Sequence, residues 1–488
     1  MKRLSTLILI LLCTVSCRQK VGDMTILSNL PEIWPDYVDV TVPVGIAPLN
    51  FGMADESFDC IDVSLTTEAG PWLRVQGRDH VEFPIREWHS LLESAAGADI
   101  KVQVVARNGG RWLAFKAFHI HVSPDPIDWG LNYRLITPGY QNYAHMGIYE
   151  RDLSCFDEHP LLENTQFGGC LNCHCYNRCD PSEYSIHVRG DHGATLLKLD
   201  GELAAYDTKT DSTTGFCVYP YWHPSGDYII YSANHTRQTF HVGQGKVIEV
   251  FDDSSDLQVY DTRANALVLS PSVRRADKWE TFPTFSPDGG TVYFCAADTV
   301  KLPVNIRKVH YSLYKASFDA ATGRIGDDVE VLLAATDSTS ISFPRPSFDG
   351  RFIMYTLSEY GNFSVWHPES DLWLLDLRSG ETRRLDGANS QFADSYHNFS
   401  GSSRWFVLGS RRVDRACTRP FICHIDSLGR EGKAFLLPQK NPRKYYREQM
   451  CSYNIPEFVS GPVDLNAREA GKMIAGPARK KFGVKSSD

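Results

Sequence analysis

The chain has 488 residues, of which 42% are hydrophobic and 22% charged. This is ordinary globular composition, which excludes disordered, collagen-like and coiled-coil proteins and leaves room for roughly three domains of about 150 residues. The 50 Lys and Arg against 59 Asp and Glu give a net charge of −9, which argues against a dedicated nucleic-acid binder. Aromatic residues make up 12% of the chain, which suits a strand-rich fold.

The first residues have the pattern of an export signal. A basic start (Met-Lys-Arg) precedes an apolar run from Leu7 to Leu12 that is too short for a transmembrane helix. Thr14-Val15-Ser16-Cys17 then resembles the lipobox of bacterial lipoproteins, in which the Cys is acylated. We therefore expect residues 1–17 to be a lipoprotein signal, with lipid on Cys17 holding the protein on a membrane. The predicted location is the cell envelope, at the outer membrane facing the periplasm; the alternative is a secreted protein with Cys17 in a disulfide.

Residues 24–123 are predicted to form a separate β domain. Strand-like alternation begins at Val38, and a hairpin signal lies at Asn108-Gly109-Gly110. The stretch Ile85–Ala96 fits one short helix. An immunoglobulin-like β-sandwich is the expected fold, with Ser123-Pro-Asp-Pro as a linker.

The rest of the chain repeats, and the repeat decides the fold class. Each repeat has a short strand, a turn rich in Ser, Gly, Asp or Pro, and an apolar-aromatic strand. The four clearest copies are YPYWHPSGDYIIYSA from Tyr219, FPTFSPDGGTVYFCAA from Phe282, FPRPSFDGRFIMYTL from Phe343 and SYHNFSGSSRWFVLGS from Ser395.

A second repeated piece ends on Asp at intervals of 50 to 61 residues. The five aspartates are Asp200, Asp261, Asp319, Asp376 and Asp426. Repeated strands without helices between them predict a β-propeller of WD40-like repeats over residues 127–460, with five or six blades. The sixth would be assembled from both ends, by the stretch Ile136–Leu153 and the stretch Ser452–Phe458. The whole chain is thus predicted to be all-β, with residues 461–488 as a C-terminal tail.

A cysteine cluster at residues 170–179 is the most specific local motif. Cys170-Leu171-Asn172-Cys173-His174 has the C-x-x-C-H spacing with which two thiols attach a c-type haem and the His binds its iron. We therefore predict haem attachment at Cys170 and Cys173, with His174 as the metal ligand. Met146 or His187 would be the second axial ligand.

The extra thiols of Cys175 and Cys179 leave three alternatives to haem open. The cluster could be a zinc site, two disulfides, or a loop without a cofactor.

Several segments form an ordered set that includes VPVGIAPLNF, MGIYERDL, GGCLNCH, HVRGDHGAT, FSPDGGTVYFCAA, GNFSVWHPESDLWLLD and SYNIPEF. Together they resemble a group of bacterial cell-envelope TolB-like propeller proteins that carry a C-x-x-C-H motif and are sometimes labelled cytochrome c biosynthesis proteins, and the resemblance runs from about residue 39 to 460. The resemblance implies a periplasmic lipoprotein with an N-terminal β domain, a propeller and a haem, but no reaction. Cys175 and Cys179 depart from the group's pattern.

Aromatic, His and Arg residues are expected where the blades converge on the propeller axis. They are Tyr219, Trp222, His223, Arg345, Trp366, His367, Tyr396 and His397. No G-x-S-x-G, H-E-x-x-H or phosphate loop is present in the sequence. We therefore predict a binding or assembly protein that takes a protein or glycan ligand in the propeller funnel, with the haem serving electron transfer or redox sensing. The alternative is a polysaccharide lyase or glycosidase with its site in the same funnel.

Two short basic runs, Arg411-Arg412 and Arg479–Lys485, are expected to be solvated surface.

Overall fold

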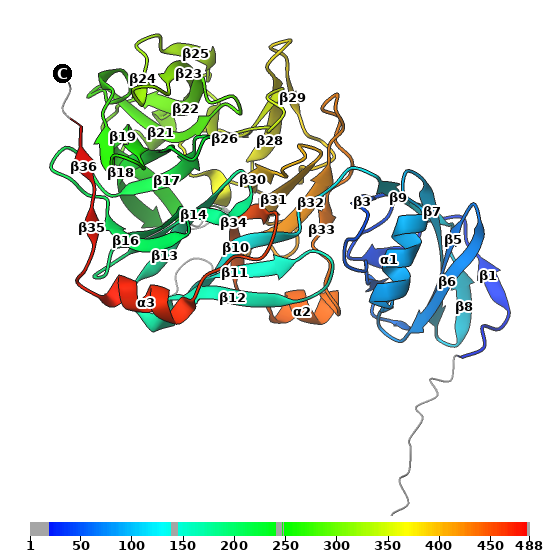
Figure 1. The fold of residues 1–488 in the computed structure, drawn as a ribbon. Helices are drawn as coiled ribbons and strands as arrows, with labels where there is room; N and C mark the ends of the chain where they lie inside the picture. The colour runs from blue at the N-terminus through cyan, green and yellow to red at the C-terminus, as the bar shows by residue number, and fades with distance from the viewer. Residues whose placement is uncertain (1–18, 138–144, 241–245, 247, 486–488) are drawn as a thin grey trace, which may run out of the picture.

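Two β-rich parts follow one another in the computed structural model, which describes residues 19–137, 145–240, 246 and 248–485. The N-terminal domain, blue in Figure 1, lies beside a larger assembly of sheets. Cys17 and the predicted signal lie outside the described residues. Within the described residues, no helix is long and apolar enough to cross a membrane.

The N-terminal domain is built on a seven-stranded sheet of order β1-β8-β7-β5-β6, in which β9 pairs with both β7 and β3. The predicted helix forms as α1 (Ile85–Ser94), and the predicted hairpin joins β7 to β8. The strands are β1 (Met24–Ile26), β2 (Ile33–Trp34), β3 (Thr41–Pro43), β4 (Gly52–Met53), β5 (Phe58–Thr67), β6 (Gly70–Gly77), β7 (Asp99–Asn108), β8 (Arg111–Ala114) and β9 (Phe118–Ser123).

Two large facing sheets, as in the expected immunoglobulin-like sandwich, are not shown for this domain. Its second sheet is only the pair β2–β4. Helix α1 instead buries Trp88, Leu91 and Leu92, which lie on one helical face, in the same core as Val63 and Val102 of the large sheet.

The rest of the chain is a six-bladed β-propeller, which confirms the predicted propeller. The innermost strands are neighbours in a closed ring, β34-β13-β17-β21-β26-β30. The strands of each blade are given from the inside outwards. The first two blades are β34 (Ser452–Val459), β10 (Gly130–Ile136), β11 (Met146–Asp152) and β12 (Glu158–Glu163), then β13 (Cys170–Asn177), β14 (Asp180–Arg189), β15 (Ala194–Leu199) and β16 (Glu202–Asp207). The third and fourth blades are β17 (Cys217–Trp222), β18 (Tyr228–Phe240), β19 (Ile248–Asp261) and β20 (Ala266–Val268), then β21 (Lys278–Phe285), β22 (Thr291–Asp298) and β23 (Ser312–Asp319), with β24 (Arg324–Ile325) and β25 (Glu330–Leu333) both paired with β23. The fifth and sixth blades are β26 (Ser340–Pro346), β27 (Phe352–Ser358), β28 (Asp371–Asp376) and β29 (Thr382–Arg384), then β30 (Asp394–Phe399), β31 (Trp405–Ser410), β32 (Arg419–His424) and β33 (Phe435–Leu436).

The ring is closed by both ends of the propeller sequence, as predicted. β34 pairs antiparallel with β10, and Leu131 faces Phe458 in this register. The short helix α2 (Pro442–Glu448) precedes β34. The remaining helical turns are single 3-10 turns at η1 (Asn164–Gln166), η2 (Pro271–Val273), η3 (Ile306–Lys308) and η4 (Ser364–Trp366).

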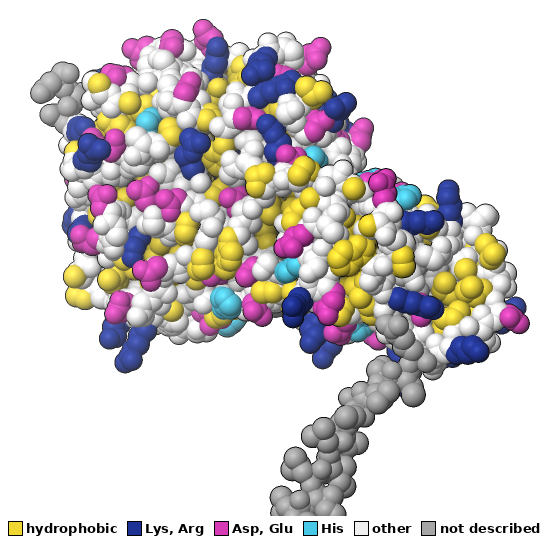
Figure 2. Space-filling view, turned by 45° about the vertical axis from the view of Figure 1, so that its right-hand side comes forward, with side chains coloured by type: hydrophobic (Ala, Val, Ile, Leu, Met, Phe, Trp, Pro, Cys, Tyr) yellow, Lys and Arg dark blue, Asp and Glu magenta, His cyan; other side chains and the backbone are white. Residues whose placement is uncertain are grey.

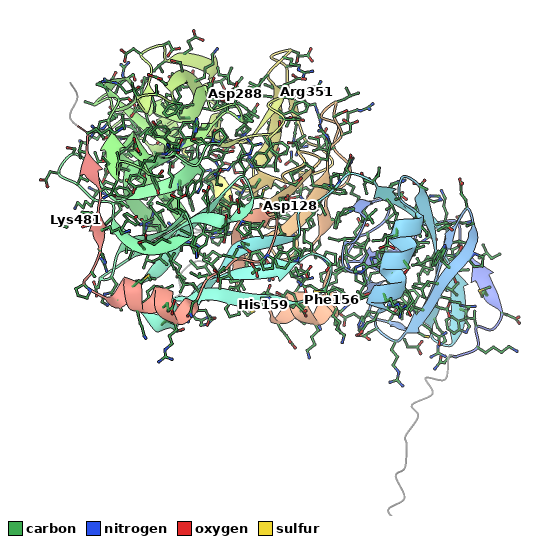
Figure 3. All side chains as sticks on the ribbon, viewed as in Figure 1. Asp128, Phe156, His159, Asp288, Arg351 and Lys481 are labelled. Atoms are coloured by element: carbon green, nitrogen blue, oxygen red, sulfur yellow. The ribbon has the colours of Figure 1, made fainter. Side chains whose placement is uncertain are left out.

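Three of the repeated aspartates end the third strand of their blades, as the repeat predicts, and Asp200 and Asp426 follow that strand within two residues. Carboxylates of this series cap the turn to the fourth strand: Asp319 accepts from the Ala321 amide at 2.9 Å, and Asp376 from the Arg378 amide at 2.9 Å. Asp288 and Arg351, marked in Figure 3, lie in the other repeated turn, between the first and second strands.

The N-terminal domain packs on the propeller through apolar and polar contacts. One hydrophobic core contains Val42 of the domain and Trp405 of the last blade. At its edge the Tyr37 hydroxyl donates to the Leu436 carbonyl at 3.2 Å, and His424 lies 2.7 Å from a carboxylate oxygen of Asp125.

The C-terminal tail forms a strap along the outside of two blades. After α3 (Ala467–Ala475), β35 (Lys480–Lys481) adds to β16 and β36 (Gly483–Val484) adds to β20. Phe482 between them is buried and stacks on Tyr260 with ring centroids 3.8 Å apart. Lys481 marks the strap in Figure 3. The backbone of the run Arg479–Lys485 is therefore paired with two blades and Phe482 is buried, whereas its lysines Lys480, Lys481 and Lys485 are exposed, as predicted.

Charges of both signs are scattered over the face of the molecule shown in Figure 2. This agrees with the small net charge of the sequence.

Candidate ligand-binding site on the propeller axis

Every innermost strand carries the same backbone irregularity. The pairing with the second strand shifts register at an equivalent pair of residues in each blade, over both residues in five blades and over Cys173 alone in the blade of β13. The first of the two has φ between 47° and 52°, a left-handed conformation that is rare for residues with a side chain. The second is Pro in four blades and His in two, at His174 and His397. We call the six left-handed residues the axial plug: Cys173, Tyr219, Phe282, Phe343, Tyr396 and Ile455.

The axial plug closes the middle of the propeller. Its rings touch in sequence, with centroids 4.7 Å apart for Tyr219–Phe282, 4.3 Å for Phe282–Phe343 and 5.1 Å for Phe343–Tyr396. Because each innermost strand runs along the axis, residues before the plug face one side and residues after it face the other. The plug thus separates two axial spaces.

On the side where the innermost strands begin lies a cavity of about 250 Å³, which we call the axial cavity. Five of the six blades contribute to its wall. The lining residues are Arg134, Ile136, Thr137, Cys170, Asn172, Arg189, Tyr219, Thr236, Arg237, Gln238, Ile248, Val250, Phe363, Val365, Trp366, Tyr396, Arg411, Ser452, Asn454 and Ile455. Four of these are Arg, whereas none of these described residues is Asp, Glu, His or Lys.

Two of the arginines are held rigidly. Arg134 on β10 is buried, and its Nη1 donates to the Leu171 carbonyl at 2.9 Å and to Asn172 Oδ1 at 2.8 Å. Arg411 follows β31, and its Nε donates to the Val365 carbonyl at 2.7 Å. Its guanidinium lies 3.3 Å from the ring centroid of Trp366, a cation–π contact. Burial lowers the pKa of Arg411 to about 10, so the group stays charged at neutral pH.

The hairpin of β18 and β19 forms one wall of the axial cavity and is fixed by two buried acids. Glu249 accepts from the Tyr360 hydroxyl at 2.9 Å and lies 3.0 Å from His367 Nε2. Asp252 accepts from Asn362 Nδ2 at 2.8 Å, with further bonds from the hairpin itself. These contacts join the hairpin to the loop before β28, so the wall is already formed without a ligand.

On the other side of the plug, the described residues enclose two small spaces of about 30 Å³ each. Glu457, Arg345 and Tyr221 border both of them. Burial raises the pKa of Glu457 to about 7 and raises the pKa of the Cys175 thiol well above its usual value. This side is packed and offers no space for a ligand larger than water.

The C-x-x-C-H motif does not fit a haem in this fold. Cys170 borders the axial cavity, whereas His174 borders one of the 30 Å³ spaces, and Cys173 is part of the plug between them. His174 occupies the position of Pro in four other blades, and its burial lowers its pKa to about 4. Two thiols that belong to different levels of the axis, with packed side chains around the His, cannot hold one porphyrin face.

The two residues predicted as a second axial ligand lie in the core. Met146 is buried, and its sulfur accepts from the Leu171 amide at 3.3 Å. His187 is buried, its Nδ1 lies 2.9 Å from the Thr195 hydroxyl, and burial lowers its pKa to about 3. Both side chains are therefore used in packing.

Zinc and disulfides also find no support among the described residues. The cysteines from Cys60 to Cys451 are all free thiols, and no group of three or more His, Cys, Asp or Glu in this part of the chain could hold a metal ion.

The residues predicted to face the propeller axis are divided by the plug. Tyr219, Tyr396 and Trp366 line the axial cavity. Arg345 and Trp222 lie on the packed side. His223 lies in a turn, His397 bonds to the Met354 carbonyl, and His367 holds the hairpin.

The arginines that distinguish the axial cavity were not predicted from the sequence. Arg411 was expected to be solvated but is only 6% exposed. Arg189 is paired across the sheet with Cys170, which lies three residues before the plug residue Cys173. In the same way, the backbone amide of Arg411 donates to the carbonyl of Ala393, which lies three residues before the plug residue Tyr396. The two arginines therefore occupy equivalent positions of their blades, and a residue-by-residue alignment of the repeats would have paired them.

No known family model matches the chain, and no curated protein matches it. Among solved structures, a DUF4784 family protein from Bacteroides caccae is 9% identical, with a TM-score of 0.33, over 75% of this chain and 98% of that chain. A puromycin-hydrolyzing peptidase from Mycobacterium tuberculosis is 10% identical, with a TM-score of 0.36, over 62% of this chain and 46% of that chain. Prolyl oligopeptidase B from Galerina marginata is 10% identical, with a TM-score of 0.35, over 62% of this chain and 44% of that chain. The chain spans less than half of either peptidase, and similarities this low carry no argument about its activity.

Proposed function

We propose that this protein is a lipid-anchored binding protein of the cell envelope and that its propeller takes a ligand in the axial cavity. The observation that carries this proposal is a preformed cavity of about 250 Å³ to which five blades contribute. Cavities of this kind, at the point where repeated elements converge, are where proteins bind small ligands. The export signal and Cys17 support the location.

The lining favours binding over catalysis. A glycosidase needs a pair of carboxyl groups beside the scissile bond, and the described lining contains neither Asp nor Glu. Burial raises the pKa of Tyr219 well above its usual value and also that of Tyr396, so neither phenol is suited to act as a base at neutral pH. The polysaccharide lyase or glycosidase alternative is therefore less favoured than binding.

The proposal can be tested by filling the cavity. Val250 lines it, so Val250→Trp would occupy part of its volume. Val331, 51% exposed on β25 at the outside of the propeller, offers the same substitution as a control. In a screen of oligosaccharides, sugar acids and short peptides, a ligand of the axial cavity should lose at least about tenfold in affinity with Val250→Trp, and none with Val331→Trp. Binding that withstands Val250→Trp would contradict the proposal.

The lipid anchor needs its own test, because Cys17 lies outside the described residues. Cys17→Ser should move the protein out of the membrane fraction, and equal membrane association of the variant would contradict the anchor.

A haem stays a prediction of the motif alone. Because the thiols and His174 do not fit one porphyrin, we expect the protein to be colourless even when it is produced with a cytochrome c maturation system. A haem absorption band that survives denaturation would show that the fold differs around Cys170 and Cys173.

A further inference from the structure

Three of the four arginines at the axial cavity have no carboxylate partner among the described residues. Arg237 pairs with Asp253. Arg134, Arg189 and Arg411 form no ion pair there, and Arg189 also makes no hydrogen bond. They come from three adjacent blades, β10, the end of β14 and the residue after β31. Guanidinium groups that are buried or half-buried without an ion-pair partner cost free energy unless an anion joins them.

The nearest acids are occupied elsewhere. Asp252 acts on Arg189 through its charge, but its oxygens already accept hydrogen bonds from Asn234, Thr236 and Asn362. Asp414 acts on Arg411, but it is paired with Arg419 at 2.9 Å. The sequence also has no Asp or Glu in the stretches 138–144 and 241–247, which follow and precede lining residues. None of the described carboxylates therefore forms an ion pair with the three groups, although the charge of Asp252 attracts Arg189.

Free donors remain on these arginines. Arg134 is 7% exposed, and its buried Nε has no partner. Nε and Nη1 of Arg411 are used on the carbonyls of Val365 and Ala416. Planar guanidinium donors match the paired oxygens of a carboxylate, sulfate or phosphate.

The remaining wall is apolar. Ile248, Val250, Phe363, Val365 and Trp366 form it, and they suit the ring or hydrocarbon body that carries an anionic group.

We infer that the ligand of the axial cavity is a compact organic anion, a ring or short carbon body bearing a carboxylate, sulfate or phosphate, whose oxygens bind Arg134, Arg189 and Arg411. This inference rests on the proposed function, because it names the chemical class of the ligand in the same cavity.

The test is calorimetric titration of the full purified chain at low salt with four probes: glucuronate, inorganic sulfate, inorganic phosphate and glucose. Glucuronate should bind, and its affinity should fall as salt is added, whereas glucose should not bind. Arg189→Gln should lower the affinity for glucuronate by at least about tenfold, because it removes charge-assisted hydrogen bonds. Arg263→Gln, at an arginine paired with Asp227 on the outside of the propeller, should leave the affinity unchanged.

Each outcome decides between the two proposals. Sulfate or phosphate binding as tightly as glucuronate would support the oxyanion site and assign it to a free inorganic anion. Glucose binding as well as glucuronate, no anion binding at millimolar concentration, or full affinity in Arg189→Gln would overturn the inference. A ligand that is lost with Val250→Trp but indifferent to Arg189→Gln would keep the axial binding function and overturn only the anionic class.

Discussion

The two sides of the axial plug are built from the same strands but are used differently. Before the plug, four arginines and an apolar wall surround about 250 Å³ of open space. After it, Arg345, Glu457 and Asn398 close the axis down to spaces of about 30 Å³. Two half-buried arginines show the contrast best: Arg345 donates to Asn398 at 3.0 Å, whereas Arg189 has no such partner in the described chain. One side is therefore packed for stability, and the other keeps unsatisfied groups that the proposed ligand would bind.

Removing a plug residue should have the largest effect on this division. Phe282 is 2% exposed and touches plug residues on both sides. Phe282→Ala should lower the free energy of unfolding by about 3–5 kcal/mol, because it leaves a cavity between packed rings. Urea denaturation measures this, with Leu428→Ala at a residue that is 57% exposed as the control. A loss below about 1 kcal/mol would show that the plug does not hold the two sides apart.

Much of this fold could be predicted from the sequence, because a propeller repeats its turn chemistry. The turns around Gly289 and Gly350 and the repeated aspartates such as Asp376 predicted five of the blades. The closing strand near Ser452 was predicted as part of a sixth blade built from both ends of the propeller sequence. The N-terminal sandwich was expected from strand patterns that do not specify how sheets pair.

The site was harder to predict because its residues come from different blades. Cys173-His174 hid the repeated left-handed pair, since the same positions in other blades hold Phe-Pro, Tyr-Pro, Ile-Pro or Tyr-His, and the C-x-x-C-H spacing suggested haem. Arg411 looked like an ordinary surface charge, because nothing local shows that Trp366 covers it.

The packed side should show a distinctive pH dependence through Glu457. Its pKa is raised by burial from 4.5 to about 7, so the folded chain holds this proton where the unfolded chain has lost it. The contribution of Glu457 to stability is therefore largest below pH 4.5 and declines as the pH rises towards 7, by up to about 3 kcal/mol. His187 and His397, whose pKa values burial lowers to about 3, act in the opposite direction as the pH falls below 6.5.

Glu457→Gln tests this pH dependence, because it removes the titrating carboxyl of Glu457. The variant should be more stable than the wild type at pH 7.5 and equal to it near pH 4.5, as measured by urea denaturation at both values. Glu330→Gln, at an exposed glutamate, is the control and should change neither. A constant difference at the two pH values would show that Glu457 does not carry a raised pKa.

The same substitution on the two sides of the plug should affect stability differently. Arg345→Gln removes satisfied hydrogen bonds to Asn398 and the Pro344 carbonyl and should cost about 1–3 kcal/mol of unfolding free energy. Arg189→Gln removes an unpaired charge and should leave stability unchanged within about 0.5 kcal/mol or raise it. Thermal denaturation of the two variants in ligand-free buffer compares them, and a large loss for Arg189→Gln would mean that this arginine is structural.

The thiol of Cys170 allows the charge of the axial cavity to be measured directly, without knowing the ligand. Cys170 lines the cavity and is partly exposed, whereas most other cysteines are buried; the remaining half-exposed thiols, Cys155 and Cys451, can be replaced by Ser together with Cys17. Its reaction rates with an anionic and a cationic methanethiosulfonate of similar size are compared with those of a free thiol in solution. The cluster of arginines should favour the anionic reagent by roughly tenfold, and Arg189→Gln or added salt should reduce the preference. Equal relative rates, or a preference for the cationic reagent, would contradict an anion-binding axial cavity.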